Sequence, residues 1–268
     1  MANSINTNSG ALIALQSLNQ TGRDLGVTQN RINTGLKVAS AKDNGAIFAI
    51  AAGLRAEQGA LDSVKNSIQR GQSVIDVSLA AGETITKALE EQKGLAVAIQ
   101  SSVAGSAAET AYLADFNALG AEITAALGGA NFDGINLFSA GSATNNLVVQ
   151  TGTSTTFSVH AAAATATTVS TAATATRATA TAANVEAAIT AFSAKLGTLG
   201  SNSKSLERQL TFTSKIQDAL ETGVGNLVDA DLAKESARLQ ALQTKQQLGV
   251  QALSIANQSS SILLGLFR

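Results

Sequence analysis

The chain of 268 residues contains no proline, no cysteine and no tryptophan. An average composition would include about thirteen prolines, so their absence is a feature of this sequence. Without cysteine the chain has neither a disulfide nor a thiol nucleophile, and without proline it has no helix breaker and no slow X–Pro isomerisation. These absences suit a protein that is exported unfolded and refolds outside the cell. They suit equally any helix-rich chain that tolerates little proline.

Aromatic residues are also scarce, at 3% of the chain, whereas hydrophobic residues reach 45%. The core must therefore be built from Ala, Leu, Ile and Val. Small aliphatic side chains let helices approach one another closely along their whole length, which favours helix-on-helix packing over a globular enzyme core. The composition predicts a mainly α fold of long packed helices.

Several classes of function have no support in the sequence. His160 is the only histidine and no HExxH segment occurs, so we expect no catalytic residues, no cofactor and no metal, and no enzyme. The net charge of −1, without a run of Lys or Arg, argues against nucleic-acid binding. No apolar run approaches the roughly 20 residues that span a bilayer. The polar stretch Met1–Gly10 does not have the pattern of a cleaved secretory signal.

The two ends of the chain carry apolar residues at seven-residue intervals, which is typical of long amphipathic helices. The last segment is apolar on more than one face, so one neighbouring helix cannot cover it. Isolated helices are marginal in water, and we therefore expect these ends to become ordered when several neighbouring chains surround them. These apolar residues form lines along the helices, which are Leu18, Leu25 and Ile32 at the start of the chain, and Leu232, Leu239 and Leu253 with Leu248, Ile255 and Ile262 at its end.

Between the ends, changes of periodicity divide the chain into further elements. A helical period predicts long helices, and the alternation around Val149 and Phe157 predicts a β-hairpin. Gly223 and Gly225 are expected to break the chain before the last helix. The predicted elements are a helix over residues 5–32, one from the capping pair Ser40 and Asp43 to about 100, helices over 109–127 and 185–216, a hairpin within about 131–160, a Thr/Ala-rich surface segment over about 161–183, and a last helix from about 229.

Several short segments carry a resemblance to a known family. They are Ile5–Asn8, Arg31–Val38, Ser40–Asp43, Asn131–Phe138, Asp229–Glu235 and Leu264–Arg268. In these motifs, and over essentially its whole length, the chain closely resembles bacterial flagellin in a short form that lacks large outer domains. The resemblance implies an inner helical coiled-coil domain, residues 1–40 with 226–268, as the filament core. It also implies a middle domain, residues 41–225, with long helices, the hairpin and the Thr/Ala-rich segment.

The leading hypothesis from this resemblance is a structural subunit that polymerises into the bacterial flagellar filament for swimming motility. Two alternatives stay open: a hook–filament junction protein with the same ends, and a soluble binding module whose ends form an intramolecular coiled coil. The leading hypothesis implies a secreted, extracellular protein that is exported without a cleaved signal peptide. Its implied partners are copies of itself, sibling flagellins, the export apparatus, an export chaperone, and cap and junction proteins, with neither nucleic acid nor membrane insertion.

The sequence predicts two groups of site residues. Under the filament hypothesis, burial between subunits is assigned to Leu12, Leu15, Leu18, Leu25, Ile32, Leu232, Leu239, Leu242, Leu248, Leu253, Ile255, Ile262, Leu263 and Phe267. The hydroxyl-rich segment in the middle is interpreted either as a permissive surface loop or as a set of acceptors for O-linked sugars. The acceptors under the second interpretation are Thr151, Thr153, Ser154, Thr155, Thr165, Thr167, Thr168 and Thr171.

Overall fold

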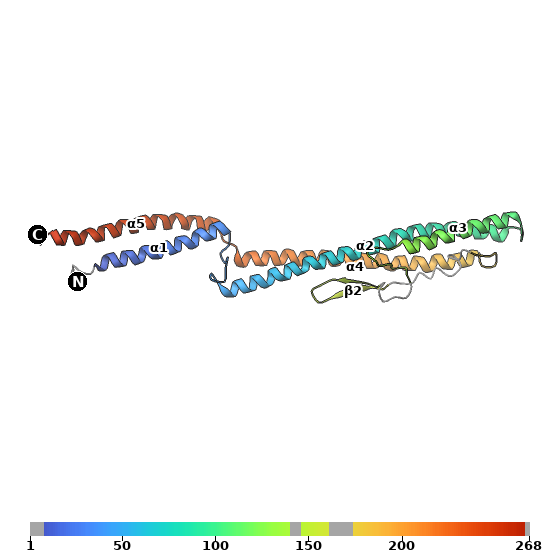
Figure 1. Cartoon of the computed structure of the whole chain (residues 1–268), viewed down its shortest axis with the longest axis horizontal. Helices are drawn as coiled ribbons and strands as arrows, with labels where there is room; N and C mark the ends of the chain where they lie inside the picture. The colour runs from blue at the N-terminus through green and yellow to red at the C-terminus, as the bar shows by residue number, and fades with distance from the viewer. Residues whose placement is uncertain (1–7, 140–145, 161–173, 266–268) are drawn as a thin grey trace. The chain divides into compact units, whose positions relative to one another are not determined.

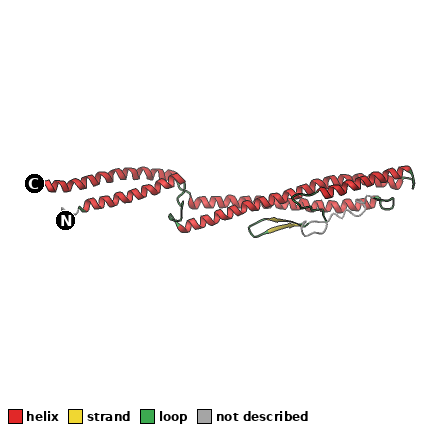
Figure 2. Cartoon of the chain, in the orientation of Figure 1, coloured by secondary structure: helices red, strands yellow, loops and turns green. Residues whose placement is uncertain are grey.

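The computed structural model describes residues 8–139, 146–160 and 174–265, with side chains up to residue 258. Helices make up most of these ranges, and their one sheet is a two-stranded hairpin (Figure 2). The prediction of a mainly α fold with a small hairpin is therefore confirmed. The elements follow in the order α1 (Ser9–Thr34), α2 (Gly45–Ser101), α3 (Ala107–Gly129), β1 (Leu147–Gln150), β2 (Thr156–Val159), α4 (Ala182–Val228) and α5 (Leu232–Gly265) (Figure 1).

The chain divides into two compact units. The first unit contains Met1–Ala56 and Ala219–Arg268, and the second contains Glu57–Asp218. The first unit thus combines α1 and α5 with the beginning of α2 and the end of α4. The inner domain predicted from the resemblance, residues 1–40 with 226–268, is shorter than this unit, and its role as a filament core stays a prediction.

The second unit has a continuous aliphatic core that runs along α2, α3, α4 and the hairpin. Phe138 and Phe192 form its aromatic pair, with ring centroids 5.4 Å apart. Such a pair contributes about 1 kcal/mol beyond the burial of its surface. The fully buried large apolar side chains include Ile68, Ile75, Ile85, Leu89, Ile99, Phe116, Ile123, Leu137, Leu147 and Leu206.

The β-hairpin packs closely against α2 within this unit. Its strands are antiparallel, with Leu147 paired to Val159 and Val149 paired to Phe157. A Cβ atom at Gly71 of α2 would lie only 2.4 Å from Val149 Cγ2. The glycine therefore allows the strand to approach the helix more closely than any other residue would.

Two polar side chains also hold the hairpin to the helices. Ser67 Oγ on α2 accepts a hydrogen bond from Gln150 N at 2.9 Å. On α4, Gln209 Nε2 donates to the carbonyl oxygen of Thr151 at 2.9 Å. Both bonds involve the end of β1, so this end is fixed between α2 and α4.

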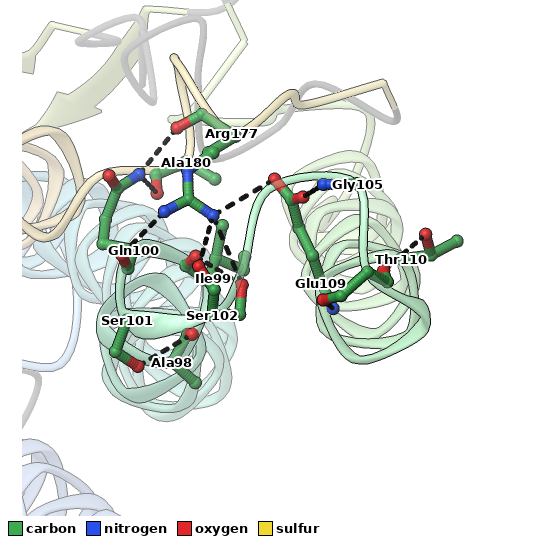
Figure 3. Close-up of polar contacts among 11 residues, drawn as sticks. Ala98, Ile99, Gln100, Ser101, Ser102, Gly105, Glu109, Thr110, Arg177 and Ala180 are labelled. Atoms are coloured by element: carbon green, nitrogen blue, oxygen red, sulfur yellow. Dashed lines mark hydrogen bonds and ion pairs between the residues drawn. The ribbon is translucent and has the colours of Figure 1, made fainter.

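A polar network centred on Arg177 ties the end of α2 to the segment that precedes α4 (Figure 3). The guanidinium donates to the carbonyl oxygens of Gln100 and Ser102 at 2.8 and 3.0 Å. It also lies 3.4 Å from the carboxylate of Glu109, which is buried at the start of α3. Gln100 Nε2 donates in return to the carbonyl oxygens of Arg177 and Ala180. The network satisfies carbonyl groups that the end of a helix leaves without helical partners.

One predicted break in the helices is wrong. Helix α4 continues through Gly223 and Gly225 and ends at Val228. Val224 and Val228 are buried in a small apolar cluster of the first unit. This packing outweighs the loss of helix stability that each glycine causes, which is about 1 kcal/mol.

The start of α2 also differs from the prediction. Helix α2 begins at Gly45, and Asn44 caps it because its side-chain oxygen accepts a hydrogen bond from Ile47 N at 3.1 Å. The carboxylate of Asp43 instead accepts hydrogen bonds from Ala39 N, Ser40 N and Ser40 Oγ. These bonds, above all the one from the Ser40 backbone, hold the pKa of Asp43 below its usual value. Asp43 therefore fixes the turn before the helix rather than the helix itself.

Candidate interaction surface

Helices α1 and α5 of the first unit pair in antiparallel orientation. Arg31, in the last turn of α1, forms an ion pair with Glu235 at 3.0 Å, near the start of α5. At the other end of the pair, Asn8 Nδ2 donates to the carbonyl oxygen of Ala256 at 2.7 Å. These two contacts fix which turn of α5 lies opposite each turn of α1.

The segments that connect these two helices to the rest of the first unit meet in a short backbone pairing. Gly35 follows α1 with a φ of 71°, a left-handed conformation that glycine adopts without strain. Its carbonyl oxygen accepts from Ala230 N at 2.8 Å, and Lys37 N donates to the carbonyl oxygen of Val228 at 2.6 Å. The two portions of the chain are thus joined through their backbones beside the helix pair.

One face of α1 forms the seam with α5. Thr21 and Thr28 are buried there, and they alternate with the half-buried Leu18, Leu25 and Ile32. The steps of three and four residues between these positions are those of a coiled-coil seam. The apolar line predicted for the first helix therefore lies on the face that is already packed within the chain.

The matching face of α5 has the same spacing. Glu235 and Leu242 are buried, and Leu239 and Leu253 are half-buried. Six of the predicted interface residues thus belong to what we term the seam. They are Leu18, Leu25, Ile32, Leu239, Leu242 and Leu253.

A second group of apolar side chains lies outside the seam. Each member keeps between 44% and 67% of its surface exposed. Ile13, Val27 and Val250 were not predicted, because they fall outside the seven-residue lines. Counting apolar residues on every face of the helices would have included them. This outer set consists of Leu12, Ile13, Leu15, Val27, Leu232, Leu248, Val250 and Ile255.

The remaining predicted interface residues cannot be placed on either surface. The side chains of Ile262 and Leu263 lie outside the described residues, although both positions belong to α5. Phe267 lies wholly outside the described ranges. The assignment of all fourteen residues to contacts between subunits stays a prediction.

The candidate sugar acceptors fall into three groups. Thr153, Ser154 and Thr155 are exposed in the turn between the strands. Thr151 is half-buried, and its hydroxyl donates to the carbonyl oxygen of Thr155 at 3.4 Å. Thr165, Thr167, Thr168 and Thr171 lie outside the described residues, as does most of the Thr/Ala-rich segment.

The described residues also bear on the other classes of site, those that bind a metal ion or cross a membrane. In these ranges no group of three or more His, Cys, Asp or Glu residues could hold a metal ion. None of the described helices has the length and apolar character that crossing a membrane requires. His160 is exposed directly after β2. The first unit presents exposed apolar side chains on its paired helices.

A chain made mostly of long helices, with its two terminal helices paired, defines a mainly helical structural protein. Comparison with known families agrees with this class. The bacterial flagellin N-terminal helical region matches residues 5–144, and the bacterial flagellin C-terminal helical region matches residues 182–267. The chain belongs to the bacterial flagellin family.

Individual flagellins are similar to the chain along its whole length. Flagellin FljM of Caulobacter vibrioides is 51% identical over 99% of both chains, and Flagellin FljK of the same organism is 50% identical over 99% of both. A flagellin of Brucella melitensis biotype 1 is 36% identical, again over 99% of both chains. Flagellins polymerise into the extracellular flagellar filament. The prediction of a structural filament subunit for motility is therefore confirmed.

Proposed function

We propose that the chain assembles into the flagellar filament by burying its outer set between neighbouring copies, while the seam holds α1 to α5 within each copy. The observation that carries the proposal is the exposure of eight large apolar side chains on two helices that are packed against each other only along the seam. Soluble monomers rarely leave so much apolar surface in water unless it binds a partner.

The outer set supplies the driving force for this assembly. Complete burial of one Leu or Ile contributes about 1.5–3 kcal/mol, and these side chains are about half exposed, so each contributes roughly 1 kcal/mol. Leu248 and Ile255 lie far around α5 from Leu242, since each residue turns the helix by about 100°. A helix other than α1 must therefore cover them, and we assign that helix to a second copy.

The first unit supports the domain assignment that we propose. It contains both chain ends and the whole outer set. We assign residues 1–40 with 226–268 to the filament core and residues 41–225 to the middle domain.

Export and further partners belong to the same proposal. We assign delivery to the flagellar export apparatus with an export chaperone, without cleavage of a signal peptide. Cap and junction proteins, and sibling flagellins where the cell makes them, are the other assigned partners. The structural character of the family supports the absence of catalytic activity.

The alternative of an intramolecular coiled coil agrees with the seam but not with the outer set. The pairing of α1 with α5 is the contact that this alternative requires. A finished coiled-coil module would carry polar side chains on its outer faces. The eight exposed apolar residues favour assembly instead.

We also propose Thr153, Ser154 and Thr155 as sugar acceptors, because their hydroxyls are exposed in the turn of the hairpin. The mass of the intact chain from native filaments tests this assignment. A mass above 27.0 kDa is expected, and the bare mass of 27.0 kDa would contradict it.

The substitution Ile255→Asp tests the assembly proposal. Ile255 is 67% exposed, so an aspartate there leaves the isolated chain folded but places a charge in the contact between copies. We expect seeded polymerisation to stop while the helical circular dichroism is retained, and the matched control Ile255→Leu to polymerise normally. Filaments of Ile255→Asp at the wild-type critical concentration would overturn the assignment. Leu239→Asp is less suitable, because Leu239 is half-buried and its loss would also disturb the seam.

A further inference from the structure

A hollow on the second unit combines an apolar floor with a basic edge. Leu137, Phe138 and Leu199 form the floor, and all three are buried. Lys195 of α4 and His160 line the hollow beside them. Its volume is about 320 Å³. The hollow can therefore accept apolar side chains and place an acidic group next to Lys195.

Lys195 has no counter-ion among the described residues. Lys93 pairs with Glu186 of α4, but none of the ion pairs in the described ranges includes Lys195. Lys195 is half-buried, and this burial lowers the pKa of its ammonium group. A partly desolvated cation without a partner gains from the approach of a carboxylate.

A groove between α2 and α3 has the opposite charge. Leu95 and Leu119 are half-buried and form its apolar part, and the exposed Glu91 and Asp115 stand along it. Neither carboxylate forms an ion pair within the described part of the chain. The groove has a volume of about 570 Å³.

We propose that α4 of one copy lies in the α2–α3 groove of a second copy, with Lys195 between Glu91 and Asp115 of that neighbour. The side chains along α4 can interdigitate with those of α2 and of α3, as rows of side chains do wherever two helices pack together. The apolar parts of the hollow and of the groove are buried together, and the charged groups stand at the edge of the contact.

The two surfaces also have the arrangement that a polymer needs. They share no residue and lie on different helices of the same unit, so one copy can use both at once. A head-to-tail contact between unlike surfaces continues from copy to copy, whereas a contact between like surfaces closes into a dimer. The inference rests on the proposed function and adds a contact that is independent of the terminal helices.

Reversal of single charges in the full-length chain tests this contact. Lys195→Glu places like charges together, and we expect the critical concentration for seeded growth to rise about tenfold, which corresponds to about 1.4 kcal/mol. The matched control is Lys204→Glu, since Lys204 is exposed and lies half a turn around α4 from Lys195. This control should stay within about twofold of the wild type. Adding Glu91→Lys or Asp115→Lys to Lys195→Glu should recover most of the loss.

Cross-linking supplies a second readout, because the chain has no cysteine of its own. Thr198 lines the hollow and Ala118 lines the groove, and both are exposed. In filaments of the double variant Thr198→Cys/Ala118→Cys, a short bismaleimide should give a ladder of covalent oligomers. Each single variant should give no ladder.

Three results would overturn the contact: growth of Lys195→Glu at the wild-type critical concentration, no recovery with either second reversal, or filaments without a ladder. In each case the wild type still polymerises, so the proposed function stands. If the wild-type chain forms no filaments, the proposed function fails and this contact fails with it.

Discussion

Arg31 on α1 and Glu235 on α5 form a 3.0 Å ion pair although 204 residues separate them in the sequence. Glu235 is 8% exposed, so its carboxylate depends on Arg31 for a counter-charge. Its second oxygen, Oε2, has no hydrogen-bond partner among the described residues. The pair thus fixes the register of the two terminal helices at the cost of a buried charge.

Removal of Arg31 should destabilise this helix pair. Arg31→Ala leaves a buried carboxylate without its partner, and we expect a loss of about 2 kcal/mol in the free energy of unfolding. Urea unfolding followed by circular dichroism measures it. The exposed Arg23 gives the control, since Arg23→Ala should change stability by less than about 0.5 kcal/mol. Equal losses in the two variants would contradict the role of the ion pair.

Alanine should have opposite effects on stability at two glycines of α2, Gly71 and Gly94, because only Gly71 lies against Val149. Gly71→Ala forces its new methyl group against a stiff, buried valine, so we expect a loss of about 1–3 kcal/mol. Gly94 has no other atom within 4 Å of an added Cβ. Gly94→Ala should therefore stabilise the helix by about 0.5–1 kcal/mol. Thermal unfolding distinguishes the two, and a stabilised Gly71→Ala would show that the hairpin does not pack as described.

Arg177 should contribute to stability through its hydrogen bonds to carbonyl groups as well as through its charge. Arg177→Ala removes the ion pair of the buried Glu109 and the hydrogen bonds to the carbonyl oxygens of Gln100 and Ser102, and we expect a loss of about 2 kcal/mol. Arg177→Lys keeps the charge but not the planar group, so it should recover only part of this loss. Arg208→Ala, at an exposed position of α4, is the control. Full recovery with lysine would assign the effect to charge alone.

The turn before α2 should weaken in acid because of Asp43. Hydrogen bonds from Ser40 lower its folded-state pKa below 3.8. The stabilisation is therefore complete above a pH of about 4, and it is lost as the pH falls through the folded-state pKa. Asp43→Asn removes this titration, so its stability should fall less than that of the wild type in acid. Urea unfolding at a series of pH values checks the difference, and identical profiles would contradict it.

The sequence predicted the class of fold and most helices because aliphatic periodicity is strong in a chain with few aromatic residues. It did not show whether a helix of the same chain or of another copy covers each line of apolar residues. Leu18, Leu25 and Ile32 have the spacing of a buried face, and in the structure α5 of the same chain half-covers that face. Periodicity identifies a buried face but not the helix that packs on it.

Other features depend on contacts that a single sequence does not reveal. The continuation of α4 through Gly223 and Gly225 depends on packing of Val224 in the first unit, which outweighs local propensity. The pairing of Arg177 with Glu109 joins segments on either side of the hairpin. No local pattern marks either residue as a partner of the other.

Amide hydrogen exchange of the full-length chain, as dilute monomer and as filament, tests the central claim most directly. The account predicts faster exchange along α1 and α5 in the monomer than in the filament, because only the seam is covered in the monomer and neighbouring copies cover the outer set in the filament. The amides of α2 around Ile75 and Ile85 should be protected in both states, because these side chains are fully buried within one chain. Equal protection of α1 and α5 in the monomer and in the filament would contradict the account.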